Sequence, residues 1–144
     1  MLSYIYELYN SYLSNTKFYY LSLIKEDDGS YSIHGLWPQY SLNSYPSYCK
    51  TVNFSIEKIN PIMDRLNKYW YSSTGLNADF WKHEYEKHGS CVFVPMTELS
   101  YFKKTIELYE YSLVHNIIKR YSEKNPESKK ILIPFDTEFK YIGA

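Results

Sequence analysis

The stretch FYYLSLIKEDDGSYSIHGLW, residues 18–37, carries the clearest structural signal in the chain. Aromatic and aliphatic residues dominate positions 18–25 and predict a strand there. The polar run EDDG at 26–29 is typical of a tight turn, and residues 31–37 predict a second strand. Two strands joined by a short turn predict an antiparallel pair.

The residues after this pair predict a loop and two helices. Positions 38–53 are rich in Tyr, Ser, Asn and Pro, which is typical of a loop. Asn60 and Pro61 combine a helix cap with a residue favoured at the first helical position, and apolar residues follow at helical spacing. A further helix is expected over residues 77–88, ended by Gly89.

The last part of the chain predicts one long helix and a closing strand. Thr97 is a candidate cap for a helix that runs to about Glu123, before the helix-breaking Pro126. Residues 131–141, ILIPFDTEFKY, predict a strand that Pro134 interrupts. Strands at both ends with helices between them predict a single α+β domain over the whole chain, with a central antiparallel sheet packed against α-helices.

The N-terminal segment, residues 1–16, predicts an extra short helix. Apolar residues recur there at helical spacing between Leu2 and Leu13. The segment has no basic start, contains Glu7 and lacks a small-residue cleavage site, so we do not expect a signal peptide. No run in the chain approaches the roughly 18 apolar residues of a transmembrane helix, which argues against a membrane-spanning protein.

The charge balance limits the classes of function. Lys and Arg together number 16, as do Asp and Glu, so the formal net charge is zero. Proteins that coat nucleic acid through charge alone are usually strongly basic. The balance argues against such a protein, but it is compatible with an enzyme that cuts nucleic acid at one local site.

The two cysteines, Cys49 and Cys91, are too few for a four-ligand zinc site. They could form one bridge that closes a loop of about 40 residues, worth roughly 4 kcal/mol on the chain-entropy model. A bridge would imply an oxidising compartment. The two residues by themselves leave both the paired and the free state open.

Candidate catalytic groups lie in residues 80–91, FWKHEYEKHGSC. On a helix, four polar side chains of this segment share a stripe about 140° wide: His83, Glu84, Lys87 and His88. Such a stripe suits an anionic substrate that exchanges protons, and the alternative is an ordinary solvated face with i,i+4 pairs. The two histidines are five positions apart, one more than in the zinc-protease motif, so a catalytic metal is not expected.

A second candidate segment is residues 33–38, IHGLWP. Three of the four histidines of the chain fall in these two segments. His34 stands beside Gly35, which allows a ligand or backbone to approach closely, and Trp37 could present an aromatic face to a base. The alternative is a core strand with a hydrogen-bonded histidine and a buried tryptophan.

IHGLWP and FWKHEYEKHGSC together resemble the two active-site signatures of the ribonuclease T2 family. The similarity extends to residues 59–70 and 101–109, and it covers the chain from about Phe18 to the C-terminus. The resemblance implies an endoribonuclease that needs no metal or other cofactor. Such an enzyme cleaves single-stranded RNA by transphosphorylation, through a 2′,3′-cyclic phosphate to 3′-phosphate ends.

The resemblance also implies a role for each catalytic candidate. His88 would take the proton from the ribose 2′-OH and His34 would protonate the departing 5′ oxygen. The two would exchange roles when water opens the cyclic phosphate. Lys87 and Glu84 would flank the phosphorane, where Lys87 offsets the added negative charge. His83 would bind a phosphate oxygen.

Base recognition is less well defined by the resemblance. Trp37 would stack on the base 5′ to the cut, and Phe80 is the candidate for the 3′ base. Tyr71 and Ser72 replace a Pro-Ser pair of the family, and Gln39 replaces a common acidic residue. These positions line base-binding sites in relatives, so all five residues are candidate substrate-binding residues and the base preference stays open.

The family pairs the cysteine that ends the second motif with one after the first motif. The resemblance therefore implies a Cys49–Cys91 disulfide and a secreted or otherwise oxidising location. The expected partner is single-stranded RNA, and the expected protein is a monomer that binds no metal and no membrane. The competing hypothesis is an RNA-sequestering module with little turnover, which the presence of both His34 and His88 disfavours. A structural metal module has too few suitable ligands.

Overall fold

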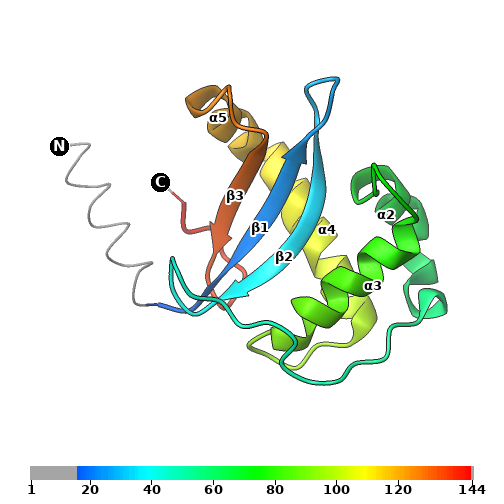
Figure 1. Ribbon diagram of the computed structural model, residues 1–144. Coiled ribbons are helices and arrows are strands. Elements are labelled where there is room, and N and C mark those ends of the chain that lie inside the picture. The colour runs from blue at the N-terminus through cyan, green and yellow to red at the C-terminus, as the bar shows by residue number, and fades with distance from the viewer. Residues whose placement is uncertain (1–15, 144) are drawn as a thin grey trace.

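The computed structural model describes residues 16–143, so the predicted N-terminal helix lies outside the described residues. A β-hairpin comes first, helices follow, and a third strand completes the sheet (Figure 1). The elements are β1 (Phe18–Lys25), β2 (Tyr31–Gln39), the 3₁₀ helix η1 (Ile56–Ile62), α2 (Met63–Tyr69), α3 (Asn77–Lys87), the 3₁₀ turn η2 (Gly89–Cys91), α4 (Glu98–Val114), α5 (Ile117–Lys124) and β3 (Lys130–Phe135).

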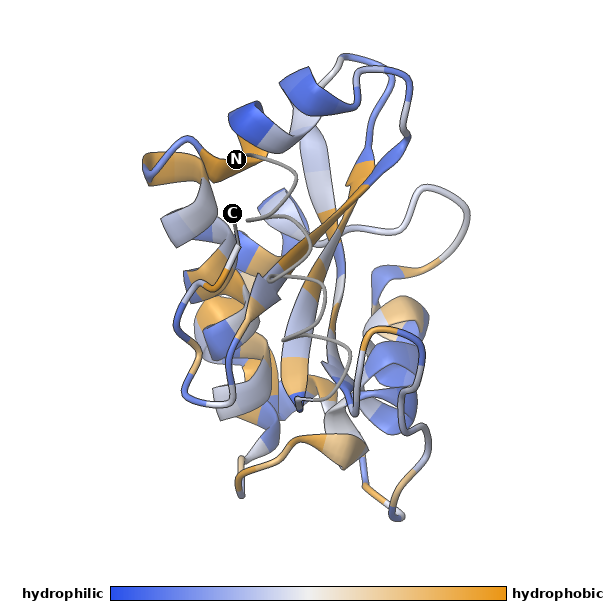
Figure 2. Cartoon of the chain, turned by 90° about the vertical axis from the view of Figure 1, so that its left-hand side faces the viewer, coloured by the Kyte–Doolittle hydropathy of each residue, from blue (hydrophilic) through white to orange (hydrophobic). Residues whose placement is uncertain are grey.

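The sheet is antiparallel with the order β2-β1-β3, so β1 is the central strand. In the view of Figure 1, α4 passes behind the sheet and α3 lies in front of α4, beside β2. Hydrophobic residues occur along the strands at the centre of the molecule, the turns at the top of the view are hydrophilic, and a loop at the bottom is hydrophobic (Figure 2). This arrangement confirms the predicted α+β fold with a central antiparallel sheet.

Aromatic side chains of the helices fix the backbone of β2. Trp70, which follows α2, donates its indole N–H to the carbonyl of His34 at 3.0 Å. Tyr101 on α4 donates its hydroxyl to the carbonyl of Leu36 at 2.9 Å. Both aromatic residues are fully buried. The backbone on either side of Gly35 is therefore held by the core and not by solvent-exposed contacts.

The predicted long helix from Thr97 to about Glu123 is wrong in one respect, because it is divided into α4 and α5. Thr97 does cap α4, since its hydroxyl accepts a hydrogen bond from the backbone N–H of Ser100 at 3.0 Å. Asn116 then adopts a left-handed conformation with φ of 59°. Asn tolerates the left-handed conformation better than most residues do, and a residue in that conformation ends a helix.

Three other predicted helix or strand boundaries differ from those in the structure. The helix expected to start at Asn60 is preceded by η1, and Pro61 lies inside that 3₁₀ helix. β2 continues through Pro38 to Gln39, which is possible because β2 is an edge strand and its proline need not donate a ladder hydrogen bond. The closing strand ends at Phe135, where a turn over residues 136–139 begins.

Candidate active site

A β-bulge places His34 on the same face of the sheet as Trp37. Ser22 pairs with Gly35 and the next residue of β1 pairs with Ile33, so His34 is the extra residue between them. In a regular strand, residues three apart point to opposite faces. The bulge removes that alternation, and it brings the His34 and Trp37 rings within 5.0 Å of each other.

The helix α3 supplies the facing groups, as the helical stripe predicted. Glu84 is only 2% exposed, and its Oε1 accepts a hydrogen bond from the Trp37 indole N–H at 2.9 Å. Its Oε2 lies 3.9 Å from Nε2 of His34 and 3.9 Å from Nε2 of His83. One carboxylate therefore joins β2 to α3 and stands between two imidazoles.

Gly35 is required by this close approach of strand and helix. A Cβ atom built on Gly35 would lie 2.2 Å from Oε1 of Glu84 and 2.7 Å from Nε1 of Trp37. The absence of a side chain therefore allows the carboxylate to reach the strand backbone and the indole. The sequence had marked Gly35 as a place of close approach, and the structure identifies Glu84 as the group that approaches.

These residues line a pocket of about 380 Å³. All five predicted catalytic residues border it, and so do Trp37 and Gln39 among the predicted substrate-binding residues. The rest of the lining consists of residues that were not predicted from the sequence: Tyr20, Leu42, Asn43, Tyr45 and Leu132. Pairing of β1 with β2 and β3 places Tyr20 and Leu132 here, a signal that exists only once the register is known.

His88 is buried against Trp37 just beyond the end of α3. It is 5% exposed, and its ring stacks on the indole at 5.0 Å with an angle of 23° between the planes. Its Nδ1 has no hydrogen-bond partner among the described residues. Burial, with a smaller effect of the positive charge of Lys87, lowers the pKa of His88 to about 3. His88 is therefore neutral over most of the acidic range and able to accept a proton.

His34 is more open than His88. Its side chain is 36% exposed, and its ring lies 5.7 Å from that of Phe80. Burial lowers its pKa from the ordinary value, and the charges of Lys130, His83 and Lys87 lower it further, in that order of size. Lys87 therefore opposes the charged imidazole, as predicted, but burial has the larger effect.

Burial also acts on the carboxylate. It raises the pKa of Glu84 to about 7, against the smaller opposing effects of the Trp37 hydrogen bond and of Lys87. At acidic pH the Glu84 carboxyl is thus mostly protonated. The predicted support of a charged imidazole by Glu84 then requires the group to lose its proton as the imidazole gains one.

The remaining predicted site residues differ in position. His83 is 55% exposed at the pocket rim, and Gln39 donates its side-chain amide to the carbonyl of Ser41. Phe80 does not border this pocket, and neither do Tyr71 and Ser72. The Ser72 hydroxyl accepts hydrogen bonds from backbone N–H groups within its own loop between α2 and α3, so a base-binding role for these two residues stays a prediction.

One face of Trp37 is covered by His88, which leaves less of the indole for a base than expected.

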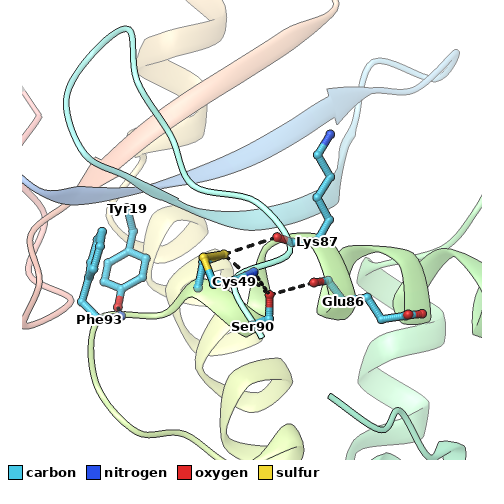
Figure 3. The surroundings of a disulfide bond; sticks show 7 residues. Tyr19, Cys49, Glu86, Lys87, Ser90 and Phe93 are labelled. Atoms are coloured by element: carbon cyan, nitrogen blue, oxygen red, sulfur yellow. Dashed lines mark hydrogen bonds between the residues drawn. A yellow bond between two sulfur atoms is a disulfide. The ribbon is translucent and has the colours of Figure 1, made fainter. Parts of the chain in front are cut away.

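The predicted Cys49–Cys91 disulfide is present (Figure 3). It attaches the loop after β2 to η2, directly after His88. The backbone N–H of Cys49 also donates to the Ser90 hydroxyl at 3.0 Å, and that hydroxyl donates to the carbonyl of Glu86. In Figure 3 the Lys87 side chain extends away from this cluster towards the strands. The bridge thus holds the end of α3 beside the loop that lines the pocket.

Replacing both cysteines by alanine is expected to lower the free energy of unfolding by about 4 kcal/mol. The two residues are 42 positions apart, and a bridge of that span restricts the unfolded chain strongly. Urea unfolding of the double variant and of the oxidised protein measures the difference. Reduced wild-type protein is the control and should match the double variant, whereas equal stability of the oxidised and reduced forms would contradict the prediction.

Within residues 16–143, no group of three or more His, Cys, Asp or Glu side chains is arranged to hold a metal ion. In the same range, no helix is both long enough and apolar enough to cross a bilayer.

The sequence is similar to a family profile and to known ribonucleases. The profile of the Ribonuclease T2 family matches residues 9–131. Ribonuclease DdI of Dictyostelium discoideum is 46% identical over 82 residues, covering 56% of this chain and 37% of that protein. Ribonuclease T2 protein rnst-2 of Caenorhabditis elegans is 33% identical over 120 residues, covering 69% of this chain and 43% of that protein. The chain thus spans less than half the length of these two relatives.

Solved structures share the fold. Ribonuclease MC1 from the seeds of bitter gourd is similar with a TM-score of 0.68 at 20% identity, over 87% of this chain and 92% of that chain. An RNase-related protein from Calystegia sepium gives a TM-score of 0.70 at 19% identity, over 89% and 90% of the two chains. With the profile match over most of the sequence and this shared architecture, the chain belongs to the ribonuclease T2 family.

Proposed function

We propose that the protein is a metal-independent endoribonuclease that cleaves single-stranded RNA by transphosphorylation. One observation carries the proposal: His34 and His88 come from different elements, contact the same indole and border one pocket. Two imidazoles in one pocket can divide the acid and base roles of a proton-transfer reaction. Mutants of ribonuclease MC1 solved in complex with 5′-GMP and 5′-UMP show that a relative of this fold holds nucleotides.

In the proposed first step, the ribose 2′-oxygen attacks the adjacent phosphorus. His88 is the neutral, buried imidazole and takes the 2′-OH proton. The more exposed His34 gives a proton to the departing 5′ oxygen, and a 2′,3′-cyclic phosphate forms. In the second step water replaces the leaving alcohol, the two histidines exchange roles, and a 3′-phosphate results.

The charged groups around the histidines act on the phosphate. Lys87 borders the pocket and supplies positive charge to the pentacovalent phosphorane, which carries one more negative charge than the diester. Glu84 lies between His34 and His83. Because its raised pKa lies near neutrality, its carboxyl group can lose a proton when a neighbouring imidazole gains one. His83 at the rim binds a phosphate oxygen in this scheme.

The chemistry of the products tests the proposal. RNA incubated with the protein in excess EDTA should be cut, leaving 2′,3′-cyclic phosphate ends that become 3′-phosphates, and 5′-OH ends on the other fragments. An oligonucleotide with a single 2′-deoxy or 2′-methoxy sugar should resist cleavage at that sugar, because the nucleophile is missing. Fragments with 5′-phosphates, or DNA cut as readily as RNA, would exclude this mechanism.

The competing function is RNA binding with little turnover. An RNA-sequestering protein would bind single-stranded RNA and release it intact in the same assay. Duplex RNA should be a poor substrate of the enzyme, because the pocket accepts a base only when it has left its helix. Sedimentation of the full chain checks the separate expectation that the protein is a monomer.

The dependence of kcat/KM on pH should have an acidic maximum. The base must be deprotonated, so the rate rises as pH passes the His88 pKa of about 3. The acid must be protonated, so the rate falls as pH passes the His34 pKa, which lies below 6.5. A profile measured on a short RNA from acidic to alkaline pH should decline before neutrality.

Two lysine variants provide the comparison for this profile. Lys87→Gln removes a positive charge that lowers the pKa of His34 and of His88. Both the rising and the falling limb of the kcat/KM profile should therefore move to higher pH. Lys82→Gln is the control, because Lys82 pairs with Glu86 and has no part in either shift. A wild-type rate that climbs steadily into the alkaline range would mean that another group is the base.

A further inference from the structure

A second hollow lies next to the catalytic pocket, at the end of α5 and the start of β3. Its volume is about 350 Å³. Leu132 borders both this hollow and the catalytic pocket, so the two depressions adjoin at this residue. We call it the distal hollow, and it is lined by Tyr121, Asn125, Ser128, Lys130, Ile131 and Leu132.

The strand register shows that Lys130 lies on the face of the sheet that carries the catalytic pocket. Ser22 pairs with both Gly35 and Leu132, and Ile24 pairs with Lys130. Paired residues of neighbouring strands project to the same side, and so do residues two apart. Leu132 and Lys130 therefore follow each other along one face, with Leu132 nearer the catalytic pocket.

Lys130 is exposed, and its ammonium group makes no hydrogen bond or ion pair within the described part of the chain, residues 16–143. Its backbone is fixed by the Ser128 hydroxyl, which accepts from the Lys130 N–H and donates to the Lys130 carbonyl. Its charge reaches the catalytic pocket, because after burial it has the largest effect in lowering the pKa of His34. Lys130 thus supplies uncompensated positive charge along this face.

The lining of the distal hollow has the chemistry of a nucleotide site. Lys130 offers an ammonium group to a phosphate, and Asn125 offers an amide that can both donate and accept hydrogen bonds. Tyr121 adds an aromatic ring, the kind of surface on which bases stack without sequence preference. An RNA chain that leaves the catalytic pocket over Leu132 meets these groups next.

We propose that the distal hollow binds a nucleotide of the same RNA chain outside the two nucleotides that flank the cut, with Lys130 on its phosphate. This inference rests on the proposed function for the identity of its ligand. Its occupant is a flanking nucleotide and not a separate ligand, because Leu132 borders both the distal hollow and the catalytic pocket. An RNA chain long enough to reach the distal hollow should then bind more tightly than a dinucleotide that occupies only the catalytic pocket.

Salt dependence of binding tests the site without any cleavage. The probe is a fluorescein-labelled oligothymidylate of about eight nucleotides, a length within the usual range for single-strand sites, which has no 2′-OH and cannot be cut. Each lost phosphate contact should make the slope of log K against log salt less steep by about 0.7. Lys130→Gln should show this change, equivalent to about two- to threefold in Kd between roughly 50 and 200 mM salt.

Two further variants make the result specific. Lys130→Arg keeps the charge and should keep the wild-type slope. Lys103→Gln is the matched control, because Lys103 is an exposed lysine on α4, outside both hollows. A wild-type slope in Lys130→Gln, or an equal loss in Lys103→Gln, would overturn the proposal.

Kinetics separate this inference from the proposed function. The ratio of kcat/KM for a ribo-oligonucleotide to that for a dinucleoside monophosphate should fall about two- to threefold in Lys130→Gln. Any change in the pKa of His34 affects both substrates and cancels in the ratio. A wild-type protein that cuts neither substrate would reject the proposed function, while the salt slope would still decide on the distal hollow. An unchanged ratio in an active enzyme would reject the distal hollow alone.

Discussion

His88→Ala and His34→Ala are each expected to lower kcat/KM for RNA by about 10²–10⁴-fold, the range for a lost general acid or base. Each variant lacks a group that must move a proton in both steps. The His34 ring lies at 74° to the Trp37 indole, whereas the His88 ring stacks on it at 23°, so the two imidazoles are held in different positions and neither can take over the role of the other. Initial rates on a short RNA, with thermal unfolding of each variant, measure the effect apart from stability.

The other two histidines are the controls for this prediction. His83→Ala should retain more activity, because His83 is exposed at the pocket rim and is assigned only phosphate binding. His115→Ala should be close to neutral, because His115 lies at the C-terminal end of α4 and does not border the pocket. Equal losses in all four variants would indicate a folding defect and would remove the argument for two catalytic histidines.

Gly35→Ala is expected to lower kcat/KM by about 10²-fold, the size of effect seen when one preorganised polar group is removed from a site. The new methyl group would lie 2.2 Å from Oε1 of Glu84 and 2.7 Å from Nε1 of Trp37. Their hydrogen bond must then break, and the buried carboxyl group loses its partner. We also expect a loss of about 1–3 kcal/mol in the free energy of unfolding.

Gly75→Ala is the matched control. The nearest atom to a Cβ at Gly75 is the Ser72 hydroxyl oxygen at 4.0 Å, so the substitution is tolerated sterically. Activity and urea unfolding of both variants should be compared under the same conditions. If Gly35→Ala kept wild-type activity, the Trp37–Glu84 hydrogen bond would have no part in catalysis, and the role given to Glu84 would be wrong.

Local sequence patterns were enough for much of the architecture. The strand over Phe18–Lys25 and the helix that presents His83, Glu84 and Lys87 together are both found where they were predicted. Alternation, helical spacing and turn residues are properties of neighbouring positions, so they can be recognised without knowing what the segment packs against. The two motifs likewise specified the family and the Cys49–Cys91 pairing, because they occur as fixed residue patterns.

Other features depended on contacts between distant segments. The bulge that turns His34 towards Trp37 exists only because β1 pairs with β2 in a shifted register. The raised pKa of Glu84 and the lowered pKa of His88 have burial as their main cause. Lys130 came to the catalytic face through the pairing of β1 with β3. The sequence alone therefore determined which chemical groups are present and which helix or strand carries them, but only the tertiary structure decided their register and burial, because both arise from packing between residues far apart in the chain.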